Sequence, residues 1–434
     1  MKFNRSTYLL FILVINLSSL ISQEESHLTK TMNTIETSQW LKIIDRGDTV
    51  NKRPGIIRSY DDRMDHQYAM DFYSYNYSIL EDSNYHLNDN AVRGWIGSIN
   101  SSVFYTNFDF KVPYEVNEDV LFNLNFFREE NYSAEHNLFI PRLTRRNIFD
   151  QKLSIHIEFT AEFIKESLDV MIGAQYKPIP SLSFSVDIAM LDFLNNSLHS
   201  GGIKTHQQEH SRQYDTSPLG FKFQGLWKWN NYKIEAFGGS TLSEKAEIEF
   251  EESRGRDFIT EMYYSYWGVL IEKAWSDDLT TGLFVNDQYA DDIKTGSDGF
   301  DITEHTLQVG AYVLKRFNER WLLEVEAVYS KLEYEKDLPT TGGNLDTDDF
   351  DVVAKAEAFW NYKEHIQLSS GLFFNRHVME ELLEDVLLTD TIVRYKFGVQ
   401  YHFNDKMFIK ITSNIGLDDF YSYGGSAGHI SILW

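Results

Sequence analysis

The stretch "HQQEH" (206–210) carries the residue types of a metal-dependent hydrolase. His206, Glu209 and His210 have the spacing H-x-x-E-H, in which two imidazoles bind zinc and the carboxylate activates a water molecule. That chemistry needs a helix, which brings both imidazoles onto one face. Here the motif lies in a long polar segment, and no helix with a third ligand follows it. We therefore predict a solvated loop, with His206 and His210 as weak candidates for metal binding.

A serine hydrolase would need a nucleophile and a base on the same surface. The late histidines His365, His402 and His429 fall on one face of their segments, whereas Ser413 falls on the other. The chain has no G-x-S-x-G motif, no Gly-rich phosphate loop and no Cys. The sequence therefore favours a protein that is not an enzyme and has no cofactor, with a hydrolase as the less favoured alternative.

Other charged residues recur at every second position of long segments. In "TIVRYKFGVQYHF", Tyr395, Phe397 and Val399 share one face, and Arg394 and Lys396 share the other. A strand places successive side chains on opposite faces, so the segment is a strand with one apolar and one polar side. The same alternation recurs in 119–129, 152–163, 167–176, 181–190, 219–229, 305–317, 350–362, 364–375 and 406–417.

The length of these segments favours a membrane barrel over a soluble sandwich. They run for ten to fourteen residues, whereas sandwich strands usually run for about five or six. About ten residues is the length of a tilted strand that crosses a bilayer. The strands would thus present their apolar face to lipid and their polar face to a lumen. The charged residues expected to line the lumen are Lys222, Lys228, Lys233, Glu235, Glu324, Glu326, Lys355, Glu357, Arg394, Lys396 and Lys410.

Two interpretations of these charges remain open. They could tune the choice of solute in a channel, because lumen residues set selectivity. Alternatively, they pair with opposite charges across neighbouring strands of a barrel whose interior is simply wet. No ladder of a single sign is seen in the sequence.

Short and long connections alternate along the chain, as in outer-membrane barrels. Short turns are predicted at 177–180, 230–231, 276–278, 317–319, 362–364 and 403–405, and long polar loops at 195–217, 241–257, 289–303, 334–349, 377–390 and 417–425. Aromatic residues gather beside the short turns, where they would form a ring at one membrane interface. These residues are Trp227, Trp229, Trp275, Trp321, Trp360, Tyr362 and Trp434.

The strand count and the N-terminus complete the predicted organisation. Seventeen strands can be assigned from residue 98 onward. An even number is expected, so an eighteenth strand is placed at 67–80, with sixteen strands as the alternative. Residues 1–22 have the basic start, apolar run and small residues of a signal peptide. Residues 23–65 would be a periplasmic extension or a plug, and 66–434 the barrel.

Composition agrees with an exported strand protein. Aromatic residues make up 15% of the chain and there are only 7 Pro residues, which favours long strands. The formal charge of −25 argues against nucleic acid as a partner, because phosphate binding needs an excess of Lys and Arg. The acidic loop segments favour a negatively charged outer rim, bathed in the cations that bridge lipopolysaccharide.

The chain as a whole resembles bacterial outer-membrane β-barrels of the porin and channel class. The resemblance rests on residues 1–22, the alternating strands from about 98 to 434, and the ending "SAGHISILW". In that class the last strand ends on an aromatic residue that the barrel-assembly machinery reads; here Ile430, Ile432 and Trp434 match that signal. The resemblance implies an all-β transmembrane antiparallel barrel in the bacterial outer membrane.

The function expected from this resemblance is passive passage of small polar solutes. The expected partners are outer-membrane lipid and lipopolysaccharide, the assembly machinery and the solutes themselves. The alternative is a barrel with a surface binding or structural role, carried by its acidic extracellular loops. The identity of the solute, the choice between channel and binder, and the oligomeric state stay open at this point.

Overall fold

Nineteen β-strands make up the regular structure of the described residues in a computed structural model. The structure describes residues 91–99, 103–130, 135–149, 152–162, 167–190, 209–216, 219–250, 258–295, 299–338, 343–382, 386–404, 407–417 and 423–433. The strands are β1 (Ala91–Ile99), β2 (Val103–Asn117), β3 (Val120–Glu130), β4 (Glu135–Ile148), β5 (Leu153–Glu162), β6 (Ser167–Ile179), β7 (Leu182–Met190), β8 (Glu209–Thr216), β9 (Leu219–Trp229), β10 (Tyr232–Phe250), β11 (Phe258–Ser276), β12 (Leu279–Thr295), β13 (Phe300–Asn318), β14 (Trp321–Leu338), β15 (Gly343–Lys363), β16 (Ile366–Glu381), β17 (Val386–Asn404), β18 (Met407–Gly416) and β19 (Tyr423–Leu433). In these residues we find no helix with the length and hydrophobicity needed to cross a membrane.

The strands form one antiparallel sheet that closes on itself. Each strand pairs with the next along the chain, except that β7 pairs directly with β9. The first strand, β1, pairs with β2 on one side and with β19 on the other. All of the nineteen strands except β8 thus form a closed ring of 18. β8 pairs only with the far end of β10, at Lys245–Phe250. The predicted 18-stranded all-β barrel is confirmed.

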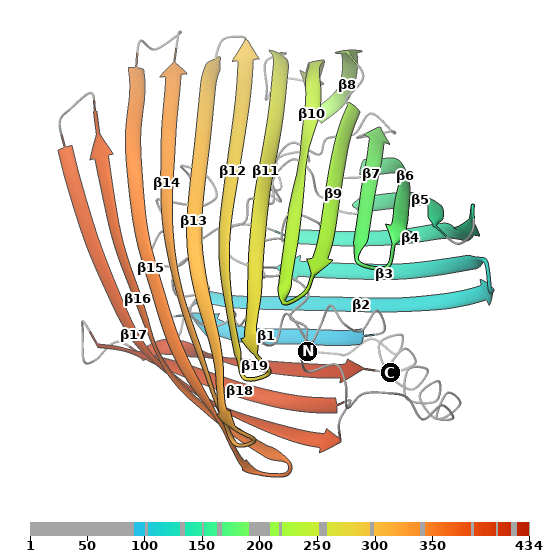
Figure 1. The fold of residues 1–434 in the computed structure, drawn as a ribbon. Coiled ribbons are helices and arrows are strands. Elements are labelled where there is room, and N and C mark those ends of the chain that lie inside the picture. The colour runs from blue at the N-terminus through green and yellow to red at the C-terminus, as the bar shows by residue number, and fades with distance from the viewer. Residues whose placement is uncertain are drawn as a thin grey trace, which may run out of the picture.

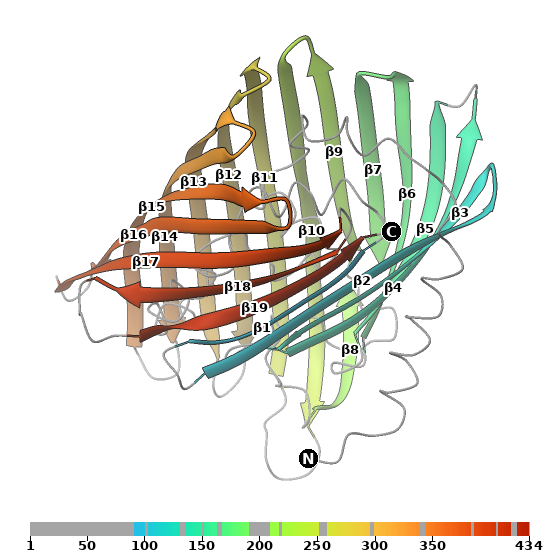
Figure 2. The same ribbon diagram turned by 90° about the horizontal axis from the view of Figure 1, so that it is seen from below.

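The two views of the ribbon show the opposed walls of this barrel (Figures 1 and 2). In Figure 1, β1–β4, β18 and β19 lie across the view, whereas β9–β15 lie steeply between its top and bottom. In Figure 2, the first group passes in front of the second. Strands of a barrel tilt against its axis, so front and back walls cross in projection.

The eighteenth strand is β1, not the segment at 67–80. β1 occupies the place between β2 and β19 that closes the ring. The segment 67–80, the signal peptide 1–22 and the predicted boundary between 65 and 66 lie outside the described residues. β1 combines small, polar and charged residues in "AVRGWIGSI", so its apolar alternation is too weak to have identified it.

The connections on one rim are tight turns, as predicted. Only two residues separate β9 from β10, β11 from β12, β13 from β14, β15 from β16 and β17 from β18. The side chain of Asn318 accepts hydrogen bonds from the backbone N–H groups of Arg320 (2.8 Å) and Trp321 (3.0 Å). Asn230 has a φ of 51°, a left-handed conformation that Asn tolerates better than most residues. We call this edge the short-turn rim.

The opposite ends of the strands differ from the predicted loops. β10 and β13 each run for 19 residues and β15 for 21. As a result, much of the ranges predicted as loops at 241–257, 289–303, 334–349 and 377–390 is paired strand. At these ends polar residues occupy both faces of the strands, so the apolar alternation stops while the backbone pairing continues. The polar sequence of these strand ends therefore predicts loops where the structure has paired strands.

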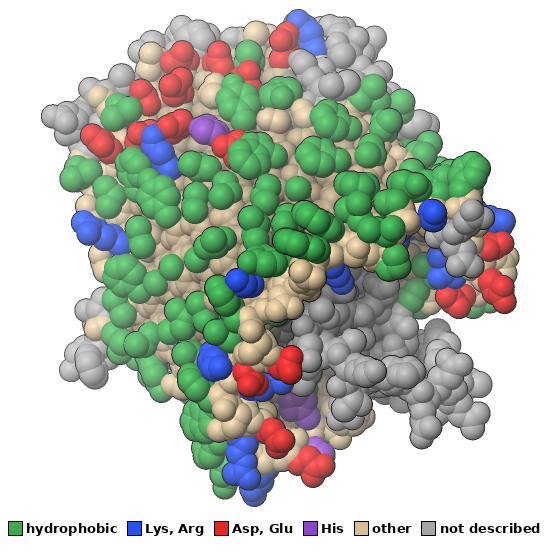
Figure 3. Space-filling view, in the orientation of Figure 1, with side chains coloured by type: hydrophobic (Ala, Val, Ile, Leu, Met, Phe, Trp, Pro, Cys, Tyr) green, Lys and Arg blue, Asp and Glu red, His purple; other side chains and the backbone are tan. Residues whose placement is uncertain are grey.

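The outer face of the barrel carries an apolar belt. On β13 the outward positions Leu307, Val309, Ala311 and Val313 are apolar, and the pattern changes at His305 to polar residues. In Figure 3 hydrophobic side chains cover the middle of the strands, and carboxylates gather over the upper ends of the strands. The belt is the surface that lipid would cover, and the acidic strand ends extend beyond it.

Candidate functional site: the inner wall of the barrel

The inward face of the barrel holds all eleven of the charged residues predicted to line the lumen. Nine of them are less than 9% exposed: Lys233, Glu235, Glu324, Glu326, Lys355, Glu357, Arg394, Lys396 and Lys410. The other two, Lys222 and Lys228 on β9, are partly exposed. These side chains thus point inward, and most of them are buried within the wall.

A buried chain of ion pairs runs across four strands of this wall. The Lys355 ammonium on β15 lies 3.0 Å from Glu324 on β14 and 3.4 Å from Glu357 on its own strand. Lys396 on β17 contacts the same Glu357 at 3.2 Å. It reaches over β16 at Gly371, which stands between them in the register and has no side chain to block the contact. These charges neutralise one another along the wall.

A second buried group crosses β10 to β13 in the same way. Lys233 lies 3.1 Å from Glu272, which also accepts a hydrogen bond from the hydroxyl of Tyr312. The ring of Tyr312 lies flat over Gly282, where a Cβ atom would overlap it. Nearby, Gln224 donates a 2.6 Å hydrogen bond to Glu235. The wall is thus built from long side chains laid across glycines.

The inward faces of β10–β18, which we call the packed half, also contain an apolar cluster. Its members are Phe237, Tyr266, Leu270, Phe284, Tyr312, Leu314, Val328, Leu332, Val353, Phe373 and Ile392. This cluster was not expected from the sequence. The signal was available, since Phe284, Leu314 and Phe373 occupy positions of the otherwise polar face.

The inward faces of β4–β9, which we call the polar half, have a different composition. Small hydroxyl and amide side chains are partly exposed there: Thr144, Ser154, Gln175, Ser183, Ser185 and Gln224. His156 Nε2 lies 2.8 Å from Asp187 Oδ1, and both side chains lie over Gly173. Arg142 lies 3.7 Å from Glu158. Water therefore reaches these polar groups of the polar half.

The aromatic residues predicted at a membrane interface lie on the outer face beside the short-turn rim, as far as the structure describes them. Trp227 and Trp229 stack with ring centroids 5.9 Å apart, and Trp321 stacks on Trp360 at 5.5 Å. Lys273 lies over the ring of Trp275 at 3.5 Å. Of the two remaining members, Tyr362 is exposed and Trp434 lies outside the described residues. Trp267 on β11 is an exposed outer-face aromatic that was not predicted.

The predicted assembly signal lies on the strand that closes the ring. Ile430 pairs with Gly94 of β1 and Ile409 of β18, and Ile432 pairs with Val92 and Met407. An edge strand that joins both ends of a sheet removes its free hydrogen-bonding edge.

The part of "HQQEH" that the structure describes does not have the helical geometry that a zinc site at this spacing would need, and it begins a strand where a solvated loop was predicted. Glu209 and His210 begin strand β8, not a helix, whereas two imidazoles at this spacing need a helix to share a face. His206 lies outside the described residues. In the described part of the chain, no group of three or more His, Cys, Asp and Glu side chains could hold a metal ion.

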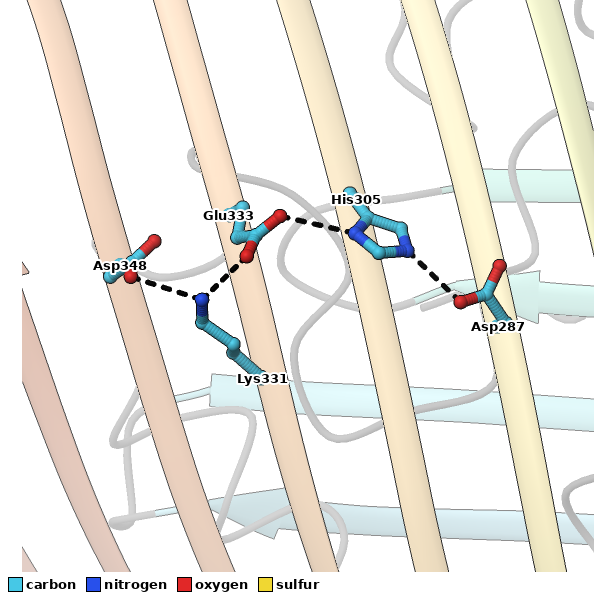
Figure 4. A network of polar contacts seen from close by, with 5 residues as sticks. All are labelled: Asp287, His305, Lys331, Glu333 and Asp348. Atoms are coloured by element: carbon cyan, nitrogen blue, oxygen red, sulfur yellow. Dashed lines mark hydrogen bonds and ion pairs between the residues drawn. The ribbon is translucent and has the colours of Figure 1, made fainter.

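A further polar network lies on the outer face, just beyond the apolar belt (Figure 4). His305 on β13 contacts Asp287 on β12 through Nε2 (2.9 Å) and Glu333 on β14 through Nδ1 (3.1 Å). Lys331 contacts both Glu333 and Asp348 of β15. Partial burial alone would lower the pKa of His305, but its hydrogen bonds to the two carboxylates outweigh burial and raise the pKa. The network ties four neighbouring strands together beyond the apolar belt.

Comparison with known proteins gives no family. No protein-family model matches the chain, and no curated protein matches it in sequence. Among solved structures, a bacterial polysaccharide outer membrane secretin is 8% identical, with 80% of this chain and 99% of that chain covered, at a TM-score of 0.38. OmpT, an outer membrane protein of Vibrio cholerae, is 10% identical over 79% of this chain and 95% of its own, at 0.35. The siderophore receptor PirA from Acinetobacter baumannii is 7% identical over 79% of each chain, at 0.37. Similarity at this level does not identify a function.

Proposed function

We propose that the protein is an outer-membrane channel for the passive passage of small polar solutes. The observation that carries the proposal is a closed ring of 18 strands with an apolar outer belt and a polar inward face. Rings of about 16 to 18 strands leave an aqueous channel in porins. An apolar belt with an aromatic border supports placement in a lipid bilayer, with the short-turn rim in the periplasm.

Conductance in planar bilayers tests this proposal. The full chain is purified from the membrane fraction in detergent, and its folding is checked by the faster migration of unboiled protein on SDS gels. We expect discrete conductance steps from the folded barrel and none from boiled protein or detergent alone. A folded barrel that inserts without conductance would contradict the proposal.

A second candidate function is supported by the strand ends beyond the belt. Their outer faces carry Asp287, Asp291, Asp301, Glu333, Glu335, Asp346 and Asp348. Such a dense acidic surface, held rigid by strand pairing, is suited to binding at the cell surface. Binding of the non-conducting folded barrel to isolated lipopolysaccharide in the presence of Mg²⁺, lost on chelation, would favour this candidate over the channel.

A further inference from the structure

We propose that the channel favours small anions, and that Arg142, Lys222 and Lys228 provide this preference. This inference rests on the proposed channel function. We call the three residues the basic strip; Arg142 lies on β4 and the two lysines on β9. All three point inward from the polar half and are partly exposed. A solute in the interior would therefore meet positive charge on this part of the wall.

The acidic neighbours of Arg142 are less accessible than Arg142 itself. Its side chain is 37% exposed, whereas that of Glu158 is 11% exposed. Their closest approach of 3.7 Å is longer than a charge-assisted hydrogen bond, which measures about 2.7–2.9 Å. The planar guanidinium therefore keeps donors for a carboxylate or phosphate in the lumen, which it can bind through two parallel hydrogen bonds.

Asp187 is held away from the lumen beside Lys222. The two residues are directly opposite each other in the register of β7 and β9. Asp187 also contacts the buried His156 at 2.8 Å, and its own side chain is only 10% exposed. The Nδ1 atom of His156 is buried and makes no hydrogen bond with the described residues. The carboxylate of Asp187 is thus covered and lies beside His156 and Lys222. Of these three side chains, water reaches Lys222.

The buried charges of the packed half largely pair with one another. Eight buried acids face inward there, against five buried cations; the acids are Glu235, Glu272, Glu304, Glu324, Glu326, Asp349, Asp351 and Glu357, and the cations are Lys233, Lys355, Arg394, Lys396 and Lys410. Among the acids, Glu272, Glu324 and Glu357 contact buried lysines, and Asp351 contacts the buried His377 at 3.2 Å. Paired charges have a short-ranged field, so these buried groups act less on a solute than the accessible cations of the basic strip.

The test is the ratio of chloride to potassium permeability, taken from the reversal potential in a KCl gradient across a planar bilayer. The triple variant Arg142→Gln, Lys222→Gln, Lys228→Gln removes the basic strip. Its matched control is Arg145→Gln, which removes a charge from β4 at an outward position that is 59% exposed. We expect chloride preference in the unmodified protein and a fall of about twofold for each charge removed, the size of a unit charge acting through about 8 Å of water. Arg145→Gln should leave the ratio unchanged.

The outcomes separate the inference from the proposed function. A conducting barrel that prefers potassium, or a triple variant with an unchanged ratio, overturns the anion preference while the channel function stands. A folded barrel without conductance overturns the channel function, and the preference falls with it. Migration of unboiled protein on SDS gels shows whether each variant is folded before its conductance is measured.

Discussion

The two halves of the inner wall use charge in different ways. In the packed half, Lys355 and Lys396 are 4% and 3% exposed and lie within an ion-pair distance of carboxylates. In the polar half, Arg142 and the lysines of β9 remain partly exposed. Both sets alternate with apolar residues in the same manner along their strands. An inward charge is therefore a lumen charge only where the wall leaves it accessible.

Glycine placement explains part of this difference. In the packed half, Gly282 and Gly371 let side chains from a neighbouring strand lie flat and reach the strand beyond. Aromatic rings fill the remaining space, and together they exclude water from the charges. The polar half has Gly173 under the pair formed by His156 and Asp187, but serines and threonines surround this pair. Small side chains leave the neighbouring cations exposed to water.

The largest contrast is expected from removing one cation in each half. Lys355→Met takes the ammonium from between Glu324 and Glu357, and loss of one partner of a buried pair typically destabilises by about 3–5 kcal/mol. Arg142→Gln removes an exposed partner and should change stability by about 0–1 kcal/mol. Urea unfolding in detergent micelles, followed by Trp fluorescence, measures both. Equal effects of the two changes would show that the halves do not differ in burial.

A smaller loss of stability is expected from filling a glycine of the packed half. The added methyl group of Gly282→Ala would overlap the ring of Tyr312 and displace its hydroxyl from Glu272. Overpacking of this kind costs about 1–3 kcal/mol. The control is Gly225→Ala on the outer face of β9, where the nearest atom to a new Cβ, in Phe184, is 3.5 Å away. Unchanged unfolding of the Gly282 variant would contradict flat packing of Tyr312.

The barrel itself was predictable because lipid imposes a strict alternation on each strand. Residues such as Tyr395, Phe397 and Val399 are exposed on the outer face, as their spacing indicates. Turn residues such as Asn230 marked the short-turn rim. β1 escaped prediction because it has few apolar residues at alternate positions, and its place depends on pairing with β2 and β19 rather than on its own pattern.

The division of the inner wall was not predictable from single strands. Lys222 and Lys396 have the same residue type and the same inward position, yet only Lys396 is fully enclosed. The difference depends on partners on other strands, such as Glu357, which is 39 residues distant from Lys396 in the chain. No local pattern encodes which neighbours a closed sheet brings together. The sequence therefore predicts which face a charge is on, but not whether water reaches it.

Cysteine accessibility measures the same difference directly. The chain has no Cys, so single variants have no background reaction. Ser185→Cys lies on the partly exposed inward face of β7, and Ser330→Cys replaces a residue that is 2% exposed in the packed half. A water-soluble thiol reagent should modify the first at least about tenfold faster, because the thiolate must reach water to react. The control is modification in urea, where the two variants should react at equal rates. Equal rates in the folded barrel as well would contradict the difference in accessibility between the two halves.

The smallest expected effect concerns the network that joins the strands of the packed half beyond the belt. The pKa of His305 is raised in the folded barrel, so its contacts with Asp287 and Glu333 stabilise the fold while the imidazole is protonated. This stabilisation is complete below the ordinary pKa of 6.5 and is lost as the pH rises through the raised value. Urea midpoints of the unmodified protein should therefore fall slightly across that window, and those of His305→Gln should not. The effect is small because His305 is 38% exposed and solvent screens its contacts. A steep fall of the urea midpoint in both proteins would assign the pH dependence to other groups.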